Sequence, residues 1–289
     1  MATYFKLVIK NEEEDYALNA SDQVFALIDE MEQRLSRFIP DSEISRINRM
    51  RAGDQLYLDY ETWDVMKMAF RAHQLSLGTF DIGVARHMDI FRASKQGILN
   101  EFERHNALLK EQEKKSKSAF YLDPDQPLII CGEAGMQFDL GGIGKGYVLD
   151  IAKKHLLEMD IDHFCISAGD STLLVSSPSQ NEDAWKFPIS AKYEQKIIKL
   201  NNQSISASGI YYQGNHIFDP RSGENDYEAP YDMAWVTATN AALSDAFSTA
   251  AFMLTTEEMV HCVNSSEDII WMAYAQDGKL HFIGNYDLI

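Results

Sequence analysis

Apolar and polar residues alternate in some parts of this chain and recur at helical spacing in others. Residues 3–10 alternate as in a β-strand, and over 21–38 apolar residues return every three or four positions, as on one face of a helix. Ser21 stands at the start of that stretch and is expected to cap the helix. Further helices are expected over 61–77, 99–117, 143–158 and 241–253.

Short apolar runs in the remaining sequence predict strands. The runs are AFYLD, PLIICG, DHFCISA, STLLVSS, WKFPISA, KIIKL, AWVTAT and DIIWMAYA. The basic run KEQEKKSKS is expected to form a solvated surface. No internal repeat or Pro/Gly/Ser-rich linker marks a boundary. The pattern therefore predicts a single α+β domain over 1–289, with a large mixed or antiparallel sheet flanked by helices.

The charge balance narrows the classes of partner. The chain has 26 Lys and Arg residues against 44 Asp and Glu residues, a formal net charge of −18. Such a surface repels nucleic acid and anionic lipid, so a polyphosphate ligand needs a metal ion or a few well-placed cations. Three cysteines without a Cys-x-x-Cys pair argue against a disulfide framework or a zinc cluster.

The amino-terminal sequence indicates the compartment only weakly. It has neither a basic segment followed by an apolar segment nor a membrane-spanning run, so a cytoplasmic protein without a membrane span is expected. A chain trimmed of its periplasmic or lipoprotein leader would look the same.

Residues 138–150, FDLGGIGKGYVLD, contain four glycines and a lysine between two aspartates. The stretch is not a P-loop, because Asp139 stands at the first glycine position and Gly146 at the hydroxyl position. It is not a dinucleotide fingerprint, because Tyr147 replaces the third glycine. Glycines let the backbone approach a ligand, and a helix beginning near Ile143 would direct N–H groups at an anion. The alternative is a tight turn from strand to helix.

The stretch TNAALSDAFSTAAFML predicts a helix of small residues capped by Asn240. Asp245 lies inside it, where a buried carboxylate is costly unless it is paired. Thr249 is one turn further on the same face, and two hard oxygen ligands at this spacing suit Mg²⁺. In the alternative, Thr249 bonds back to its own helix and Asp245 faces a buried Lys or Arg.

A third stretch, SASGIYYQGNHIFDPRSG, carries His216 together with Asp219 and Arg221. Histidine is the side chain best suited to accept a proton near neutral pH, which makes His216 a candidate general base. A structural histidine is the alternative.

These stretches, in this order, resemble the ApbE family, the FAD:protein FMN transferases, along nearly the whole chain. The matching segments are Met1-Ala2-Thr3, LSRFIPDSEISRIN, GTFD, DLGGIGKG, SGIYYQGNHIFDPRSG and SDAFSTAAFML. The resemblance implies an enzyme that splits the pyrophosphate of FAD, transfers FMN to a Thr or Ser of an acceptor protein and releases AMP.

The resemblance also implies roles for individual residues. Mg²⁺ would be held by Asp245, Thr249 and the backbone oxygen of Gly142, and His216 would accept the proton of the acceptor hydroxyl. The implied flavin contacts are Met1, Phe38, Thr79, Phe80, Asp81, Asp139 and Lys145.

Two departures from the family pattern keep alternatives open. Ser167-Ala168-Gly169-Asp170 has one glycine fewer than the family's Ala-Gly-Gly-Asp, which favours a protein that binds FAD without chemistry, and Ala2 replaces a glycine. The nearer alternative is a Mg²⁺-dependent FAD pyrophosphatase that yields FMN and AMP. Asn48, in the segment expected near the flavin, is the residue expected to separate transfer from hydrolysis.

Overall fold

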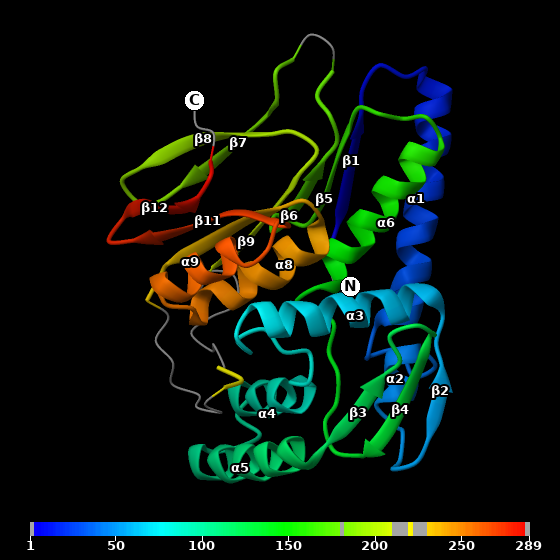
Figure 1. Ribbon diagram of the computed structural model, residues 1–289, viewed down its shortest axis with the longest axis vertical. Coiled ribbons are helices and arrows are strands. Elements are labelled where there is room, and N and C mark those ends of the chain that lie inside the picture. Colours follow the sequence, from blue (N-terminus) through cyan, green and yellow to red (C-terminus); the bar gives the residue numbers. More distant parts are fainter. Residues whose placement is uncertain (1–2, 180–181, 210–218, 222–229, 287–289) are drawn as a thin grey trace.

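A seven-stranded sheet crosses the upper part of the molecule in the computed structural model, which describes residues 3–179, 182–209, 219–221 and 230–286 (Figure 1). The strand order is β1-β5-β6-β9-β10-β11-β12, and every neighbouring pair is antiparallel. The strands are β1 (Phe5–Ile9), β5 (Phe164–Ala168), β6 (Thr172–Val175), β9 (Ser204–Gly209), β10 (Met233–Ala238), β11 (Ile269–Gln276) and β12 (Lys279–Gly284).

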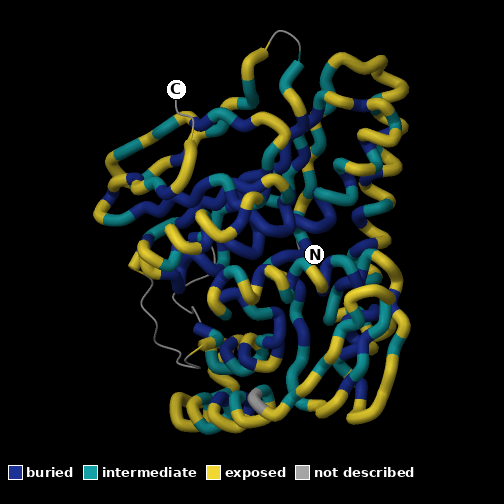
Figure 2. The backbone as a smooth tube through the Cα atoms, in the orientation of Figure 1, coloured by how far each residue is buried: buried dark blue, intermediate teal, exposed yellow. Residues whose placement is uncertain are grey.

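Helices α6 (Gly144–Glu158) and α8 (Ala241–Ala250) pack on each other and on one face of this sheet. Helix α1 (Glu14–Leu35) lies against α6, and the short helix η1 (Ala251–Met253) continues α8. Nearly every residue of α8 is buried, which Figure 2 shows as a dark segment against dark central strands. Such a helix is stable only inside a core, and its polar residues need partners there.

The other face of the sheet is covered by the hairpin of β7 (Trp185–Ser190) and β8 (Gln195–Leu200). Ile189 and Ile198 of the hairpin join a second apolar cluster with Trp235 and Trp271 of the sheet. Helix α9 (Thr256–Asn264) packs on β11 and β12. The sheet is therefore enclosed on both sides.

Among the described residues, a three-stranded sheet and the helices α2 to α5 form the lower part of the molecule (Figure 1). Its elements are α2 (Glu43–Ile47), β2 (Gln55–Tyr57), α3 (Tyr60–Leu75), α4 (Ala85–Lys95), α5 (Glu101–Lys117), β3 (Ala119–Leu122) and β4 (Leu128–Glu133). Helix α3 packs on α8, so the two parts meet beside the helix that carries Asp245.

The nine predicted strands and the predicted helices are confirmed, but the predicted start of the first helix is wrong. Helix α1 begins at Glu14, and Ser21 lies inside it with its hydroxyl donating to the Ala17 carbonyl oxygen. Glu14 and Asp15 in the first turn favour the earlier start, because carboxylates stabilise a helix amino terminus. Asn240 caps α8 as predicted, accepting from the Leu243 N–H.

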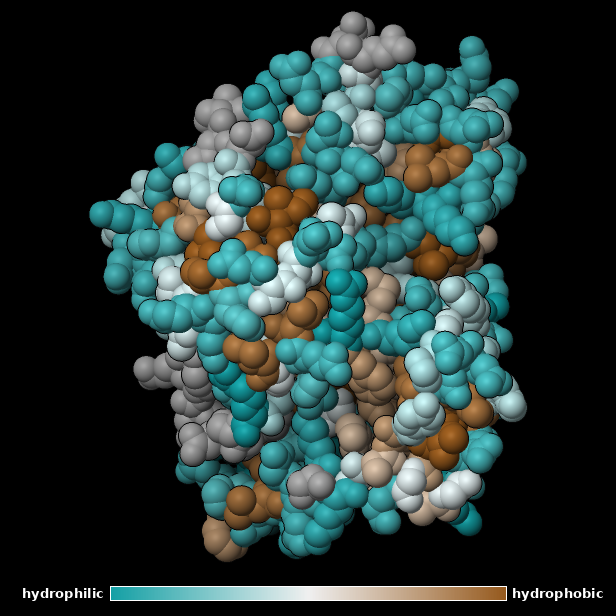
Figure 3. Space-filling view, in the orientation of Figure 1, coloured by the Kyte–Doolittle hydropathy of each residue, from teal (hydrophilic) through white to brown (hydrophobic). Residues whose placement is uncertain are grey.

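The surface is largely hydrophilic in the view of Figure 3, with apolar residues gathered in separate patches. This agrees with the acidic composition of the chain. Within the described residues, no helix combines the length and apolar character needed to cross a membrane.

Candidate active site around the glycine stretch

The glycine stretch leads into α6 at the point where α6 crosses α8. A Cβ atom on Gly146 would lie 2.0 Å from the Ala241 carbonyl oxygen, so only glycine permits this approach of the two helices. A Cβ atom on Gly142 would lie 3.1 Å from the Phe80 ring and 3.7 Å from the Thr249 hydroxyl oxygen. The stretch is thus a tight turn, and it also places Gly142 beside two of the residues predicted for the site.

Asp245 is almost fully buried, at 3% exposure, and protein donors surround its carboxylate. The Lys145 ammonium lies 2.9 and 3.2 Å from the two carboxylate oxygens. The Gly146 N–H donates to Oδ2 at 3.1 Å, and the Thr172 hydroxyl donates to Oδ1 at 3.2 Å. The sequence left open whether Asp245 faces a basic residue, and it does face one, Lys145.

Thr249 lies one turn after Asp245, and its hydroxyl is 3.5 Å from the Asp245 carbonyl oxygen. This contact is long for a hydrogen bond, so the hydroxyl remains able to bind elsewhere. Its closeness to Gly142 is what the predicted metal site requires. The described residues contain no group of three or more His, Cys, Asp and Glu side chains that could hold a metal. One carboxylate, one hydroxyl and backbone carbonyls fit Mg²⁺, which takes few protein ligands and completes its shell with water and phosphate.

Asn48 caps the carboxyl end of α2 and contacts the start of the glycine stretch. Its amide nitrogen donates to the Phe138 carbonyl oxygen at 2.9 Å, and its amide oxygen accepts from the Phe138 N–H at 2.7 Å. The next residue, Asp139, donates its N–H to the Ile82 carbonyl oxygen at 2.7 Å. Asn48 therefore fixes the backbone that leads into the site.

Arg37 joins two of the predicted flavin contacts, Phe38 and Asp139. Its Nε donates to Asp139 at 2.6 Å, and its two terminal nitrogens donate to Asp89 at 3.1 and 2.7 Å. Its guanidinium also lies over the Phe38 ring, 4.4 Å from the ring centre. Burial by itself lowers the pKa of Arg37, but Asp89 and Asp139 outweigh it and raise that pKa above its usual value. Phe38 is 64% exposed, and the Arg92 guanidinium also lies over its ring, 5.4 Å from the ring centre.

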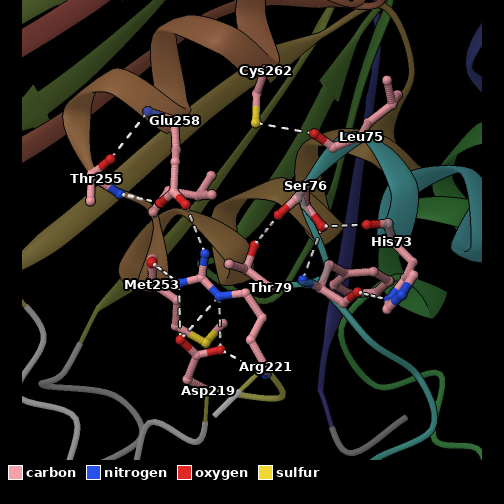
Figure 4. Close-up of polar contacts among 12 residues, drawn as sticks. His73, Leu75, Ser76, Thr79, Asp219, Arg221, Met253, Thr255, Glu258 and Cys262 are labelled. Carbon is pink, nitrogen blue, oxygen red and sulfur yellow. Dashed lines mark hydrogen bonds and ion pairs between the residues drawn. The ribbon is translucent and has the colours of Figure 1, made fainter.

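Residues 78–81 follow α3 and are held by hydrogen bonds to His73 and Ser76 at its carboxyl end (Figure 4). The Thr79 hydroxyl donates to the Ser76 carbonyl oxygen, and the Phe80 N–H donates to the Ser76 hydroxyl. His73 Nδ1 lies 2.8 Å from the Phe80 carbonyl oxygen. The Thr79 and Phe80 side chains are buried, so they support this segment.

Asp81 pairs with Lys115 of α5. Both side chains are only 14% exposed, so the basic run KEQEKKSKS is solvated in part and not throughout. Asp81 also accepts from the Gly83 N–H at 2.6 Å. Three predicted acidic site residues thus have basic partners, namely Asp81 with Lys115, Asp139 with Arg37, and Asp245 with Lys145.

Arg221 of the Asp219-Pro220-Arg221 motif contacts η1 and α9. Arg221 donates to both oxygens of buried Asp219, to Glu258 and to the Met253 carbonyl oxygen (Figure 4). The hydrogen bond with Asp219 is the main cause of a raised Arg221 pKa. His216 and Met1 fall outside the described residues, so their predicted roles stay predictions.

Residues 167–170 have one glycine fewer than the family pattern, but they keep Gly169, the glycine that the backbone conformation requires. Gly169 has a φ of +57°, and a Cβ atom there would lie 2.5 Å from the Thr3 hydroxyl oxygen. Ala168 lies in β5, where no special backbone conformation is needed. The turn before Asp170 therefore keeps the glycine on which its geometry depends.

Sequence reasoning missed Arg37, Lys115 and Thr172. Arg37 stands between two residues of a recognised motif, which was a usable signal. Lys115 and Thr172 come from segments distant in sequence, and only the fold brings them to Asp81 and Asp245.

Known proteins match this chain along most of its length. The model of a family described as the ApbE family matches residues 1–272. A protein from Chlamydia muridarum named FAD:protein FMN transferase is 27% identical over 249 residues, 82% of this chain and 75% of that protein. A protein of the same name from Klebsiella pneumoniae is 23% identical over 280 residues, 91% of this chain and 84% of that protein.

Two solved structures share the fold. The flavin transferase ApbE from Vibrio cholerae has a TM-score of 0.79 at 17% identity, covering 99% of this chain and 94% of its own. The apo flavinyl transferase ApbE of Pseudomonas stutzeri has a TM-score of 0.79 at 17% identity, covering 98% and 90%. The predicted α+β fold is confirmed by this likeness.

Proposed function

The chain belongs to the ApbE family, and we propose that it is a Mg²⁺-dependent FAD:protein FMN transferase. It cleaves the pyrophosphate of FAD, attaches FMN through a phosphoester to a Thr or Ser of an acceptor protein and releases AMP. The names of its relatives support the transferase activity. The metal, the acceptor residue and the site residues are the finer parts of the proposal.

The observation that carries the metal assignment is that the glycine stretch lies against the part of α8 that holds Asp245 and Thr249. The Gly146 N–H donates to the Asp245 carboxylate at 3.1 Å, and a Cβ atom on Gly142 would lie 3.7 Å from the Thr249 hydroxyl oxygen, although the two segments are about a hundred residues apart in sequence. In a chain of charge −18, a divalent cation held there would neutralise the charge of a bound pyrophosphate and of its leaving group.

The surrounding residues would bind and orient the nucleotide. The amino terminus of α6 begins at Gly144 and offers backbone N–H groups to a phosphate. Phe38 supplies an exposed aromatic face for the flavin, and Arg37 holds Asp139 beside it. Asn48 acts through Phe138 by fixing the entry of the glycine stretch, and His216 would accept the proton of the acceptor hydroxyl.

Product analysis tests the proposal against hydrolysis and against simple binding. The protein is incubated with FAD, Mg²⁺ and an acceptor that carries a flavinylation site, and the nucleotides are separated by chromatography. Transfer predicts one AMP for each flavinylated acceptor and no accumulation of free FMN. Free FMN formed in step with AMP would indicate a pyrophosphatase, and unchanged FAD would indicate a binding protein.

A further inference from the structure

The Lys145 ammonium lies among oxygen atoms of the candidate site, and its side chain is only partly exposed. It is 2.9 and 3.2 Å from the Asp245 carboxylate oxygens and 3.3 Å from the Gly141 carbonyl oxygen. Carboxylate and backbone carbonyl oxygens are the groups that a hard divalent cation binds. The Lys145 ammonium therefore occupies the position at which the metal proposed above would bind.

We propose that Lys145 and a divalent cation are alternative counter-ions of Asp245, so that binding of the metal displaces the lysine. The inference rests on the proposed metal site. Mg²⁺ needs oxygen atoms at about 2.0–2.1 Å, whereas an ammonium in the same place holds them near 3 Å. The Gly146 N–H and the Thr172 hydroxyl occupy other positions around the carboxylate. One carboxylate in this setting cannot serve both cations at full strength, because the two positive charges would also repel each other.

A chain of buried hydroxyls keeps Asp245 oriented when the lysine leaves. Thr172 donates to Asp245 and accepts from Ser206 at 3.3 Å. Ser206 in turn lies 2.8 Å from the hydroxyl oxygen of Ser244, which belongs to α8 itself. All three hydroxyl residues are at most 2% exposed. The exchange of cations therefore needs movement of the lysine side chain and no rearrangement of the carboxylate.

After displacement, the Lys145 ammonium can turn toward an anion bound at the amino terminus of α6. Lys145 is the second residue of α6, and its side chain is 23% exposed, compared with 4% for Asp245. A flexible lysine at a helix amino terminus can turn toward an anion bound there. Metal binding would thus free a positive charge for the pyrophosphate, and by linkage FAD and the metal would each strengthen binding of the other.

Binding of Mn²⁺, used as the probe, tests the exchange without any turnover. Mn²⁺ affinity is measured by titration of the free ion's electron paramagnetic resonance signal for the wild type, Lys145→Met and Lys154→Met. Lys154 is on the same helix and 75% exposed, so its variant matches the change in net charge. Lys145→Met should bind Mn²⁺ on the order of tenfold more tightly, because no ion pair then competes for Asp245. Lys154→Met should match the wild type.

A second substitution of Lys145 is expected to change the Mn²⁺ affinity in the opposite direction, which separates the exchange from a general effect of substituting this residue. Lys145→Arg keeps the charge and offers a preorganised fork of donors to Asp245, so it should bind Mn²⁺ more weakly than the wild type. Wild-type affinity in Lys145→Met, or a shift of both variants in one direction, would overturn the exchange and leave the metal site standing. Absence of Mn²⁺ binding to all four proteins would overturn both the exchange and the proposed metal site.

Melting temperature provides an independent readout. Lys145→Met leaves a buried carboxylate without its cation, so it should melt below the wild type in the absence of metal. Mn²⁺ should raise its melting temperature more than that of the wild type, because a ligand stabilises the folded state according to its affinity. In Lys145→Met/Asp245→Asn both charges are gone, and Mn²⁺ should have no effect. Equal stabilisation of Lys145→Met and wild type by Mn²⁺ would contradict the exchange.

Discussion

The side-chain amide of Asn48 hydrogen-bonds both backbone groups of Phe138. It donates to the carbonyl oxygen at 2.9 Å and accepts from the N–H at 2.7 Å. An amide can do both, whereas a carboxylate has no proton to donate at neutral pH. The contact ties α2 to the residue before Asp139, so Asn48 positions the glycine stretch through its backbone.

Asn48→Asp should destabilise the protein and weaken FAD binding. The carbonyl oxygen of Phe138 would lose its donor and face a negative charge, at a cost of about 1–3 kcal/mol in the free energy of unfolding. Urea unfolding and FAD titration measure the two effects. Asn201→Asp, at an exposed position, is the control for the added charge. A variant with wild-type stability and wild-type FAD affinity would show that the Phe138 contact is unimportant.

Arg37→Met should reduce the affinity for FAD more than Asp89→Asn does. The first change removes the donor to Asp139 and the cation beside Phe38, whereas the second removes only the outer partner of Arg37. Because the guanidinium is buried to 8% exposure and serves two carboxylates, its loss should also cost about 1–3 kcal/mol of stability. Flavin fluorescence titration compares the variants. Equal FAD affinities for both would refute the positioning of Asp139 by Arg37.

The stability of the protein should fall between about pH 4 and pH 7 because of Asp150. Burial raises the pKa of this carboxyl from 3.8 to about 7, although it accepts hydrogen bonds from the N–H groups of Ala241 and Ala242. The folded state therefore keeps a proton that the unfolded chain releases at lower pH. The contribution of Asp150 to stability declines as the pH rises through this range and is constant above it.

Asp150→Asn should remove that decline, on the order of 1.4 kcal/mol for each pKa unit. Urea unfolding at pH 5 and pH 7.5 gives the slope for the wild type, for Asp150→Asn and for the exposed control Asp162→Asn. The variant should be less stable at pH 5, because its amide can accept from only one of the two N–H groups at the start of α8. If the free energy of unfolding changed between pH 5 and pH 7.5 by the same amount in Asp150→Asn as in the wild type, titration of Asp150 in this range would be ruled out.

The sequence predicted the long helices and apolar strands because their patterns repeat over many residues. It missed β9, SISASG, whose face toward α8 carries the buried residues Ser204 and Ser206. A strand that buries hydroxyls lacks the apolar alternation that identifies a strand. Those hydroxyls are buried because α8 supplies partners, Ser244 and the Asn240 carbonyl oxygen, which only the fold reveals.

The candidate site was predictable where its residues lie within one motif. Asp245 and Thr249 share a helix face, and the fold brings Gly142 of the glycine stretch beside Thr249, while their role as metal ligands stays a prediction. The basic partners Arg37 and Lys115 were not identified, because each pairs with a carboxylate more than thirty residues away. Asp245 was predicted either to bind a metal or to face a basic residue. The structure shows the basic partner, Lys145, and metal binding by Asp245 stays a proposal.

The central claim is that Asp245 holds the metal that FMN transfer requires. The most direct measurement is the intact mass of the acceptor after incubation with FAD and Mg²⁺, using the wild type and Asp245→Asn. Lys145 can turn to solvent in the variant, so the fold should survive, which a melting curve checks. We predict that the wild type adds the mass of FMN minus one water to the acceptor, and that folded Asp245→Asn leaves the acceptor unmodified at the same Mg²⁺ concentration. Equal modification by both proteins, or an unmodified acceptor with the wild type, would contradict the account.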